Sequence, residues 1–104
     1  MVHSKRKGAR GEREIAKAFS TRFPEARRGP CGGFQRPEVC DVDGTPFWLE
    51  VKTGKAPRLL SALAQAEKAT DGRPPIVVAR LDNDTKPIVL MRLETFFQAL
   101  EETK

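Results

Sequence analysis

The six residues at positions 47–52, Phe-Trp-Leu-Glu-Val-Lys, constrain the fold of this chain more than any other segment. In an extended strand, alternate side chains point to opposite faces. One face then carries the apolar side chains of Phe47, Leu49 and Val51, which is typical of a hydrophobic core. The other face carries Glu50 and Lys52, so a strand here places a carboxylate and an ammonium about 7 Å apart.

Two further acids, Asp41 and Asp43, precede this segment. The turn-like sequence Gly-Thr-Pro at positions 44–46 lets the chain reverse and return an acid to the side of Glu50. An Asp followed by Glu-x-Lys on one strand is what metal-dependent phosphodiester hydrolysis requires, because two carboxylates hold Mg²⁺ and a cation orients the attacking water. Glu-x-Lys alone is more often a solvated pair, so this hypothesis depends on the rest of the chain.

The composition favours an anionic partner. The 104 residues suffice for one domain, residues 1–104, with a single core. Lys and Arg number 19 against 14 Asp and Glu, a net charge of +5, which is typical of nucleic-acid-binding proteins. Because no long apolar run or export signal is evident, we expect no membrane span and a cytoplasmic location. Cys31, Cys40 and His3 are too scattered to predict a zinc site.

Residues 1–10 are basic and lack apolar periodicity. Their cations are Lys5, Arg6, Lys7 and Arg10. We expect a flexible basic arm, which either contacts nucleic acid or is an ordinary solvated terminus.

From Gly11 to about Arg22, apolar residues recur at helical spacing and predict a helix. Its stripe consists of Ile15, Ala16, Phe19 and Phe23. At about 100° per residue, Glu12 falls within this stripe, whereas Glu14 points to the opposite face. The helix dipole alone can explain an acid in the first turn. The inward direction of Glu12 favours instead a third acid aimed at the metal.

Residues 24–38 are dense in Gly, Pro and Arg, which predicts a loop with a short strand at residues 26–28. Three of its side chains are candidates for phosphate contacts: Arg27, Arg28 and Arg36. A loop this long in a small domain is more often functional than idle. The alternative is a surface connection with solvated arginines.

The second half of the chain predicts a helix over residues 57–70, a strand covered on both faces at residues 76–79, and a strand antiparallel to it at residues 88–91. A turn at residues 82–85 joins the two strands. The closing helix has an apolar stripe that we expect to pack on the sheet, made of Leu93, Phe96, Phe97 and Leu100. The fold class is therefore α/β, with a mixed sheet flanked by helices.

Three strings occur in a suggestive order: Lys-Gly-Ala-Arg-Gly-Glu-Arg-Glu at residues 7–14, Asp-Val at residues 41–42, and Glu-Val-Lys at residues 50–52. Together with the order of the elements, they resemble the PD-(D/E)XK nuclease superfamily, and within it the archaeal and phage Holliday junction resolvases. The first string is similar to that family's Lys-Gly-x-x-x-Glu-Arg-Glu signature. The resemblance spans nearly the whole chain and implies a restriction-endonuclease-like fold.

Carried onto this sequence, the resemblance implies that Glu12, Asp41 and Glu50 bind a divalent metal, Mg²⁺ with Mn²⁺ as a substitute. Lys52 would assist the attacking water, which completes a catalytic set of four. The resemblance also places further cations at the DNA backbone, namely Arg13, Arg27 or Arg28, and Lys55.

One departure concerns the acid of the Pro-Asp motif. This chain has Pro37-Glu38 and then Cys40-Asp41, so Glu38 and Asp43 stay open as alternatives to Asp41. The continuation Asp-Val-x-Gly fits Asp41 best.

We therefore predict a Mg²⁺-dependent endonuclease of DNA recombination that resolves four-way (Holliday) junctions by paired symmetric nicks. The resemblance implies a homodimer acting on branched DNA in a bacterial, archaeal or phage-infected cell. One alternative is a nuclease of the same fold that cuts flaps, ends or duplex DNA. Another is a basic DNA-binding domain without catalysis. RNA binding is disfavoured because the chain has no Tyr and its Phe residues mostly fall on apolar stripes.

Overall fold

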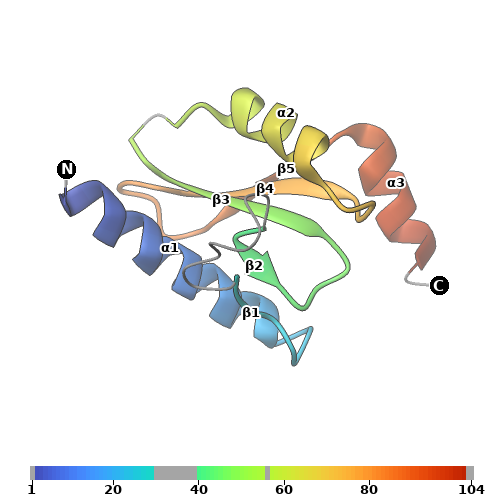
Figure 1. The fold of residues 1–104 in the computed structure, drawn as a ribbon, viewed down its shortest axis with the longest axis horizontal. Helices are drawn as coiled ribbons and strands as arrows, with labels where there is room; N and C mark the ends of the chain where they lie inside the picture. The colour runs from blue at the N-terminus through green and yellow to red at the C-terminus, as the bar shows by residue number, and fades with distance from the viewer. Residues whose placement is uncertain (1, 30–39, 56, 103–104) are drawn as a thin grey trace.

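The structure is a computed structural model that describes residues 2–29, 40–55 and 57–102. Within these ranges the chain forms three helices and five strands, whose arrangement Figure 1 shows. In order they are α1 (Val2–Ser20), β1 (Arg27–Arg28), β2 (Val42–Asp43), β3 (Trp48–Gly54), α2 (Leu59–Ala69), β4 (Pro75–Leu81), β5 (Ile88–Leu90) and α3 (Leu93–Glu102).

The five described strands form one mixed sheet in the order β1-β2-β3-β4-β5. The first three strands pair antiparallel, β3 and β4 pair parallel with α2 as their crossover, and β4 and β5 form an antiparallel hairpin. The expected α/β class and mixed sheet are confirmed, as is the antiparallel pairing of the last two strands. No helix in the described ranges has the length and apolar character needed to cross a bilayer.

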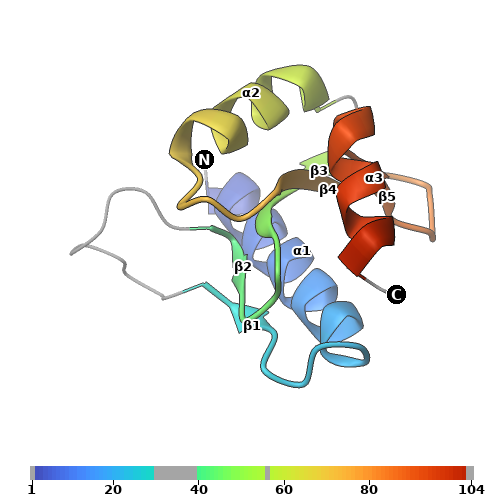
Figure 2. The same ribbon diagram turned by 90° about the vertical axis from the view of Figure 1, so that its right-hand side faces the viewer.

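The sheet lies between α1 and α2, as the two views show (Figures 1 and 2). Ile15 and Ala16 of α1 pack on Leu49 and Val51, which confirms the predicted core face of β3. On the other face, α2 covers the sheet with its short apolar side chains, Ala62, Leu63 and Ala66. The run at 76–79 is buried on both faces, as a central parallel strand should be.

Two glycines allow close approaches that position the site. A Cβ at Gly11 would collide with the Thr53 side chain, so the missing side chain lets α1 lie directly against β3. Gly44 has φ of 81°, in the left-handed region, and turns the chain after β2 while its backbone lies against the Glu25 carbonyl.

Helix α1 begins earlier than the sequence predicts. Residues 2–10, expected as an arm without regular structure, are the first half of this helix, and its end lies at Ser20 rather than near Arg22. Lys and Arg are good helix formers, so the helix packed at Ile15 and Ala16 extends through the basic segment without apolar periodicity. Phe23 lies beyond the helix and stacks on Phe19, with 6.2 Å between ring centroids.

Helix α3 forms where predicted, but its apolar stripe does not pack on the sheet. Side chains of the stripe are between 46% and 67% exposed, namely Leu93, Phe96, Phe97 and Leu100. Among the side chains of this helix that the structure describes, only Thr95 is buried. The periodicity correctly predicted an amphipathic helix, but the face of the sheet that we expected it to cover is already occupied by α1 and α2.

Candidate active site

The acid expected upstream of Glu50 is held between two strands. Asp41 directly precedes β2, and its backbone N–H donates to the Leu49 carbonyl at 2.9 Å. Its Oδ2 accepts a hydrogen bond from the Val51 backbone N–H at 2.8 Å. Asp41 is therefore fixed beside β3 by hydrogen bonds to Leu49 and Val51, the two residues that flank Glu50.

The carboxyl groups of Asp41 and Glu50 lie within hydrogen-bonding reach of each other. Burial, and then the charge of Asp41, raise the pKa of Glu50 to about 7. Burial also raises the pKa of Asp41, and the Val51 amide only partly opposes this effect. Two acids that crowd together in a partly buried site resist carrying two negative charges at once.

Glu12 reaches the same place from α1. Its charge contributes to the raised pKa of both Asp41 and Glu50. The Nε of Arg28 on β1 donates to Glu12 Oε1 at 2.8 Å, and both side chains are about two-thirds buried or more. The inward direction predicted for Glu12 is therefore observed, and its carboxylate is held by an arginine that we had expected at DNA.

Lys52 supplies the cation of the group. It lies two residues after Glu50 on β3, and its charge lowers the pKa of both Asp41 and Glu50. A pKa effect on both acids requires that the ammonium lie near both of them. The structure therefore brings together all four predicted catalytic residues, drawn from α1, the β2 region and β3.

Asp43, the main alternative acid, belongs to a different arrangement. Its Oδ1 accepts hydrogen bonds from the Gly44 N–H and from Arg73 Nη1, both at 2.9 Å, and Arg27 lies 3.9 Å from Oδ2. The Gly44 amide and then Arg73 hold the pKa of Asp43 below its usual range. The geometry thus favours Asp41 as the acid that faces Glu50. Glu38 lies outside the described residues.

The donor chemistry fits a hard divalent cation at Asp41 and Glu50. Both groups are carboxylates. Their raised pKa values come first from burial and then in part from the charges of neighbouring acids, which a cation would offset. Within residues 2–29, 40–55 and 57–102, no three His, Cys, Asp or Glu side chains are arranged to hold one metal together. Glu12 is the expected third ligand, and its oxygen is engaged by Arg28.

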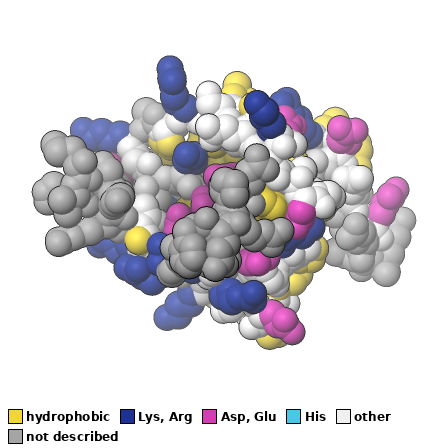
Figure 3. All heavy atoms as spheres, in the orientation of Figure 1, with side chains coloured by type: hydrophobic (Ala, Val, Ile, Leu, Met, Phe, Trp, Pro, Cys, Tyr) yellow, Lys and Arg dark blue, Asp and Glu magenta, His cyan; other side chains and the backbone are white. Residues whose placement is uncertain are grey.

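The predicted DNA contacts divide into several groups. Arg13 and Arg27 are exposed, and Arg10 and Lys55 line a pocket described below. Arg28 pairs with Glu12. The remaining positions lie outside the described side chains, namely Lys5, Arg6, Lys7 and Arg36. Figure 3 shows acidic side chains near the middle of one face with Lys and Arg side chains around them.

Two arginines were missed by the sequence reading. Arg73 organises the loop around Asp43, and Arg80 lies at the end of β4. Arg80 carried a usable signal, because parallel strands end at the same edge of a sheet and β4 follows the Glu-x-Lys strand. Nothing near Arg73 in the sequence points to its partner 30 residues away.

Comparisons with protein-family models, with curated proteins and with solved structures found no match to this chain. A functional assignment therefore depends on the geometry of the four residues Glu12, Asp41, Glu50 and Lys52.

Proposed function

We propose that this chain is a metal-dependent endonuclease of the PD-(D/E)XK type, with a restriction-endonuclease-like fold, that resolves four-way DNA junctions. The observation that carries the proposal is the crowded pair of carboxyl groups at Asp41 and Glu50 with the charge of Lys52 beside them. Placing two carboxyl groups close together does not favour folding, so such an arrangement indicates a functional site.

Each residue has a distinct role in hydrolysis. Asp41 and Glu50 would hold Mg²⁺, or Mn²⁺ as a substitute, with Glu12 as third ligand, and the ion would stabilise the charge that develops on the phosphate. Lys52 orients the attacking water and attracts a phosphate oxygen through its ammonium. The Val51 amide fixes the Asp41 carboxyl, and Arg28 fixes Glu12. One P–O bond forms to the water oxygen as the bond to the departing strand end breaks.

The substrate class follows from charge and from the resemblance of the sequence to junction resolvases. The chain carries a net charge of +5, and Figure 3 shows acidic side chains with Lys and Arg side chains around them on one face. Such a surface attracts phosphates through release of counterions. Paired nicks in opposed strands require two sites related by a two-fold axis, which a homodimer provides.

The surface that we assign to this dimer lies at the β5 end of the sheet. Strand β5 is an edge strand, and Ile88 and Val89 on it are exposed. The adjacent α3 exposes Leu93, Phe96 and Phe97. An antiparallel edge strand and an apolar helix stripe can each meet their own copy across a two-fold axis, which buries this apolar area.

The dimer is tested by sedimentation velocity. Phe97→Glu should shift the protein from dimer to monomer, because a carboxylate would be buried twice at the two-fold contact. Leu60→Glu is the matched control, since Leu60 is an exposed leucine on α2. A monomeric wild-type protein, or equal behaviour of the two variants, would rule out this surface.

The nuclease itself is tested with Glu50→Gln and Lys52→Ala on a four-way junction. Each should reduce the cleavage rate roughly 100-fold or more, while junction affinity without metal stays within a few-fold of wild type. Glu67→Gln on α2 removes a carboxylate that pairs with Arg92, and this variant should cut normally. Full activity of Glu50→Gln would contradict the proposal.

A DNA-binding domain without catalysis is the second candidate, favoured by the Arg28–Glu12 ion pair, which occupies the third acid. It predicts salt-sensitive binding that is indifferent to Mg²⁺ and yields no cleaved product. A nuclease for flaps, ends or duplex DNA would cut those substrates faster than junctions, without paired symmetric nicks.

A further inference from the structure

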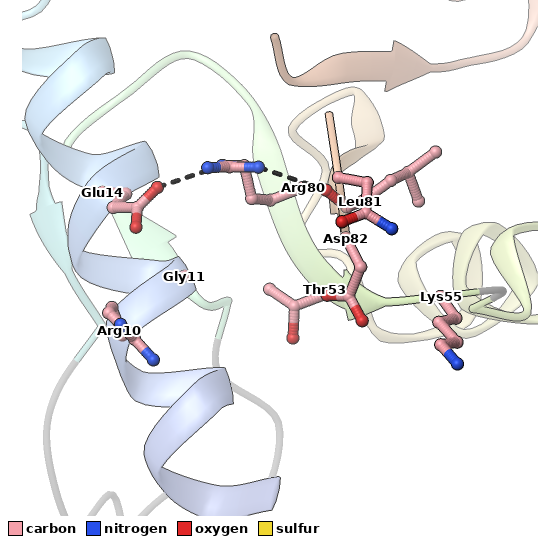
Figure 4. A pocket seen from close by; sticks show the side chains of 9 residues that line it. Arg10, Gly11, Glu14, Thr53, Lys55, Arg80, Leu81 and Asp82 are labelled. Carbon is pink, nitrogen blue, oxygen red and sulfur yellow. Dashed lines mark hydrogen bonds and ion pairs between the residues drawn. The ribbon is translucent and has the colours of Figure 1, made fainter. Parts of the chain in front are cut away.

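A cavity of about 420 Å³ lies between α1, the end of β3 and the turn after β4. None of the four proposed catalytic residues lines it. Figure 4 shows Arg10 and Glu14 projecting from α1 on one side, with Thr53, Lys55 and Arg80 on the other. Residues that are far apart in the sequence therefore line one polar cavity.

The lining of this cavity has the chemistry of an anion site. Arg10, Lys55 and Arg80 contribute three cations from three separate elements, against the two acids Glu14 and Asp82. Among the described residues, the side chains of Arg10 and Lys55 make no ion pair or hydrogen bond and are exposed. Both cations are therefore available to a ligand.

Arg80 is held in a defined position at the cavity. Its Nη1 donates to the carbonyls of Leu81 and Asp84, and its Nε donates to Glu14 Oε2 at 3.2 Å. The turn that presents the Asp84 carbonyl is formed by Asn83, whose φ is 65°. A guanidinium fixed in this way loses little freedom when it binds an oxyanion.

We propose that this cavity binds a backbone phosphate of the same DNA strand that is cut at the acids. The inference rests on the proposed nuclease function. Thr53 follows Lys52 directly on β3, and three strand steps from Glu50 to Thr53 span about 10 Å. Neighbouring phosphates of one strand lie farther apart than the axial rise of about 3.4 Å per nucleotide, so the bound phosphate is no more than about two nucleotides from the scissile one.

Glu14 distinguishes a phosphate site from a merely structural ion pair by the direction in which its loss changes DNA affinity. Its carboxylate occupies the Nε of Arg80 and repels an incoming phosphate. Loss of this charge should tighten DNA binding, whereas loss of Arg80 should weaken it. If the Glu14–Arg80 pair served only the fold, both substitutions would weaken binding or leave it unchanged.

The test measures affinity of the full-length protein for a four-way junction in EDTA at several salt concentrations. Arg80→Gln should weaken binding about 5- to 10-fold and lower the salt slope by about 1, and Glu14→Gln should tighten it about 3-fold. Arg92→Gln and Glu67→Gln are the matched controls, since Glu67 on α2 and Arg92, which directly precedes α3, form a comparable pair at 2.7 Å. They should change affinity less than 2-fold.

Two further measurements keep the result interpretable. Arg10→Gln and Lys55→Gln, which break no described contact, should each weaken binding about 3-fold even if Arg80→Gln fails to fold. In an amide NMR titration, DNA should shift the Thr53 and Asn83 signals. Shifts with inorganic phosphate but not with DNA would overturn the DNA assignment in favour of a free anion.

The remaining outcomes distinguish a failure of the cavity proposal from a failure of the nuclease proposal. Equal affinities of the Arg80 and Arg92 variants, or weaker binding by Glu14→Gln, would overturn the cavity proposal even if Glu50-dependent cleavage is found. If the expected affinity changes of the Arg80 and Glu14 variants are found but no cleavage occurs, the cavity binds a DNA phosphate and the nuclease proposal is wrong.

Discussion

Asp41 and Asp43 stand two residues apart beside β3, yet their surroundings act on them in opposite directions. The Gly44 amide and Arg73 hold the pKa of Asp43 below its usual range. Burial raises the pKa of Asp41, and the charge of Glu12 adds to this effect. One acid is neutralised by a guanidinium, while the other faces two more carboxylates.

We interpret Asp43 as a structural acid and propose Asp41 as a functional one. Folding alone favours pairing a half-buried carboxylate with a donor, as Arg73 does for Asp43. Crowding Asp41 against Glu50 costs stability unless a cation joins them. The two aspartates therefore give a direct comparison, since the same substitution in each should affect different properties.

The largest difference is expected in catalysis. Asp41→Asn should reduce the rate of junction cleavage roughly 100-fold or more, because it removes a charge from the proposed metal site. Asp43→Asn should keep the rate within about 3-fold, since Arg73 already neutralises Asp43. Initial rates at saturating Mg²⁺ and at a temperature where both variants are folded measure this difference. The assignment of the two acids is reversed if Asp43→Asn is the inactive variant.

The next difference concerns stability. Arg73 donates to Asp43 at 2.9 Å and to the Thr45 carbonyl at 3.3 Å, and its guanidinium lies 5.6 Å from the Trp48 ring centroid. Arg73→Met should lower the free energy of unfolding by about 1 to 3 kcal/mol, because it removes the closer of the two cations at the partly buried Asp43.

Urea unfolding measures this loss, and Arg92→Met is its matched control. The Arg92 side chain is 51% exposed in its pair with Glu67, so its loss should lower the free energy of unfolding less than the loss of Arg73 does. Equal losses for the two variants would show that the Arg73 cluster is an ordinary surface ion pair.

The sequence predicted the positions of Glu12, Glu50 and Lys52 better than it distinguished Asp41 from Asp43. The direction of Glu12 follows from helical periodicity, and the position of Glu50 beside Lys52 follows from strand alternation. Asp41 and Asp43 could not be separated in this way, because residues two apart share the same face of a strand. Arg73 distinguishes them, and the contact between Arg73 and Asp43 exists only in the folded chain.

The closing helix shows a second limit of sequence patterns. A stripe at positions 93, 96, 97 and 100 predicts an amphipathic helix but does not identify what covers it. In the structure the stripe is exposed. Arg80 is a similar case, because its role depends on Glu14 from a helix 66 residues earlier in the chain. Local periodicity predicted the elements, whereas the partners of individual side chains required the tertiary fold.

The smallest difference is expected in the pH dependence of stability without metal. The pKa of Glu50 is raised from 4.5 to about 7, so the folded state retains a proton that the unfolded state has lost between these values. Stability from this group is therefore full below about pH 4.5 and is lost as the pH rises to about 7. Asp43 has the opposite sign, because its lowered pKa contributes stability that is lost only as the pH falls below about 4.

Glu50→Gln should remove this alkaline loss and make the protein about 1 kcal/mol more stable than wild type at pH 8, after allowance for solvent screening. Asp43→Asn should leave the slope between pH 5 and 8 unchanged. Urea unfolding in EDTA across this range measures both. All other titrating groups are common to the proteins compared, so parallel curves for wild type and Glu50→Gln would mean that the pKa of Glu50 is not raised in the folded state.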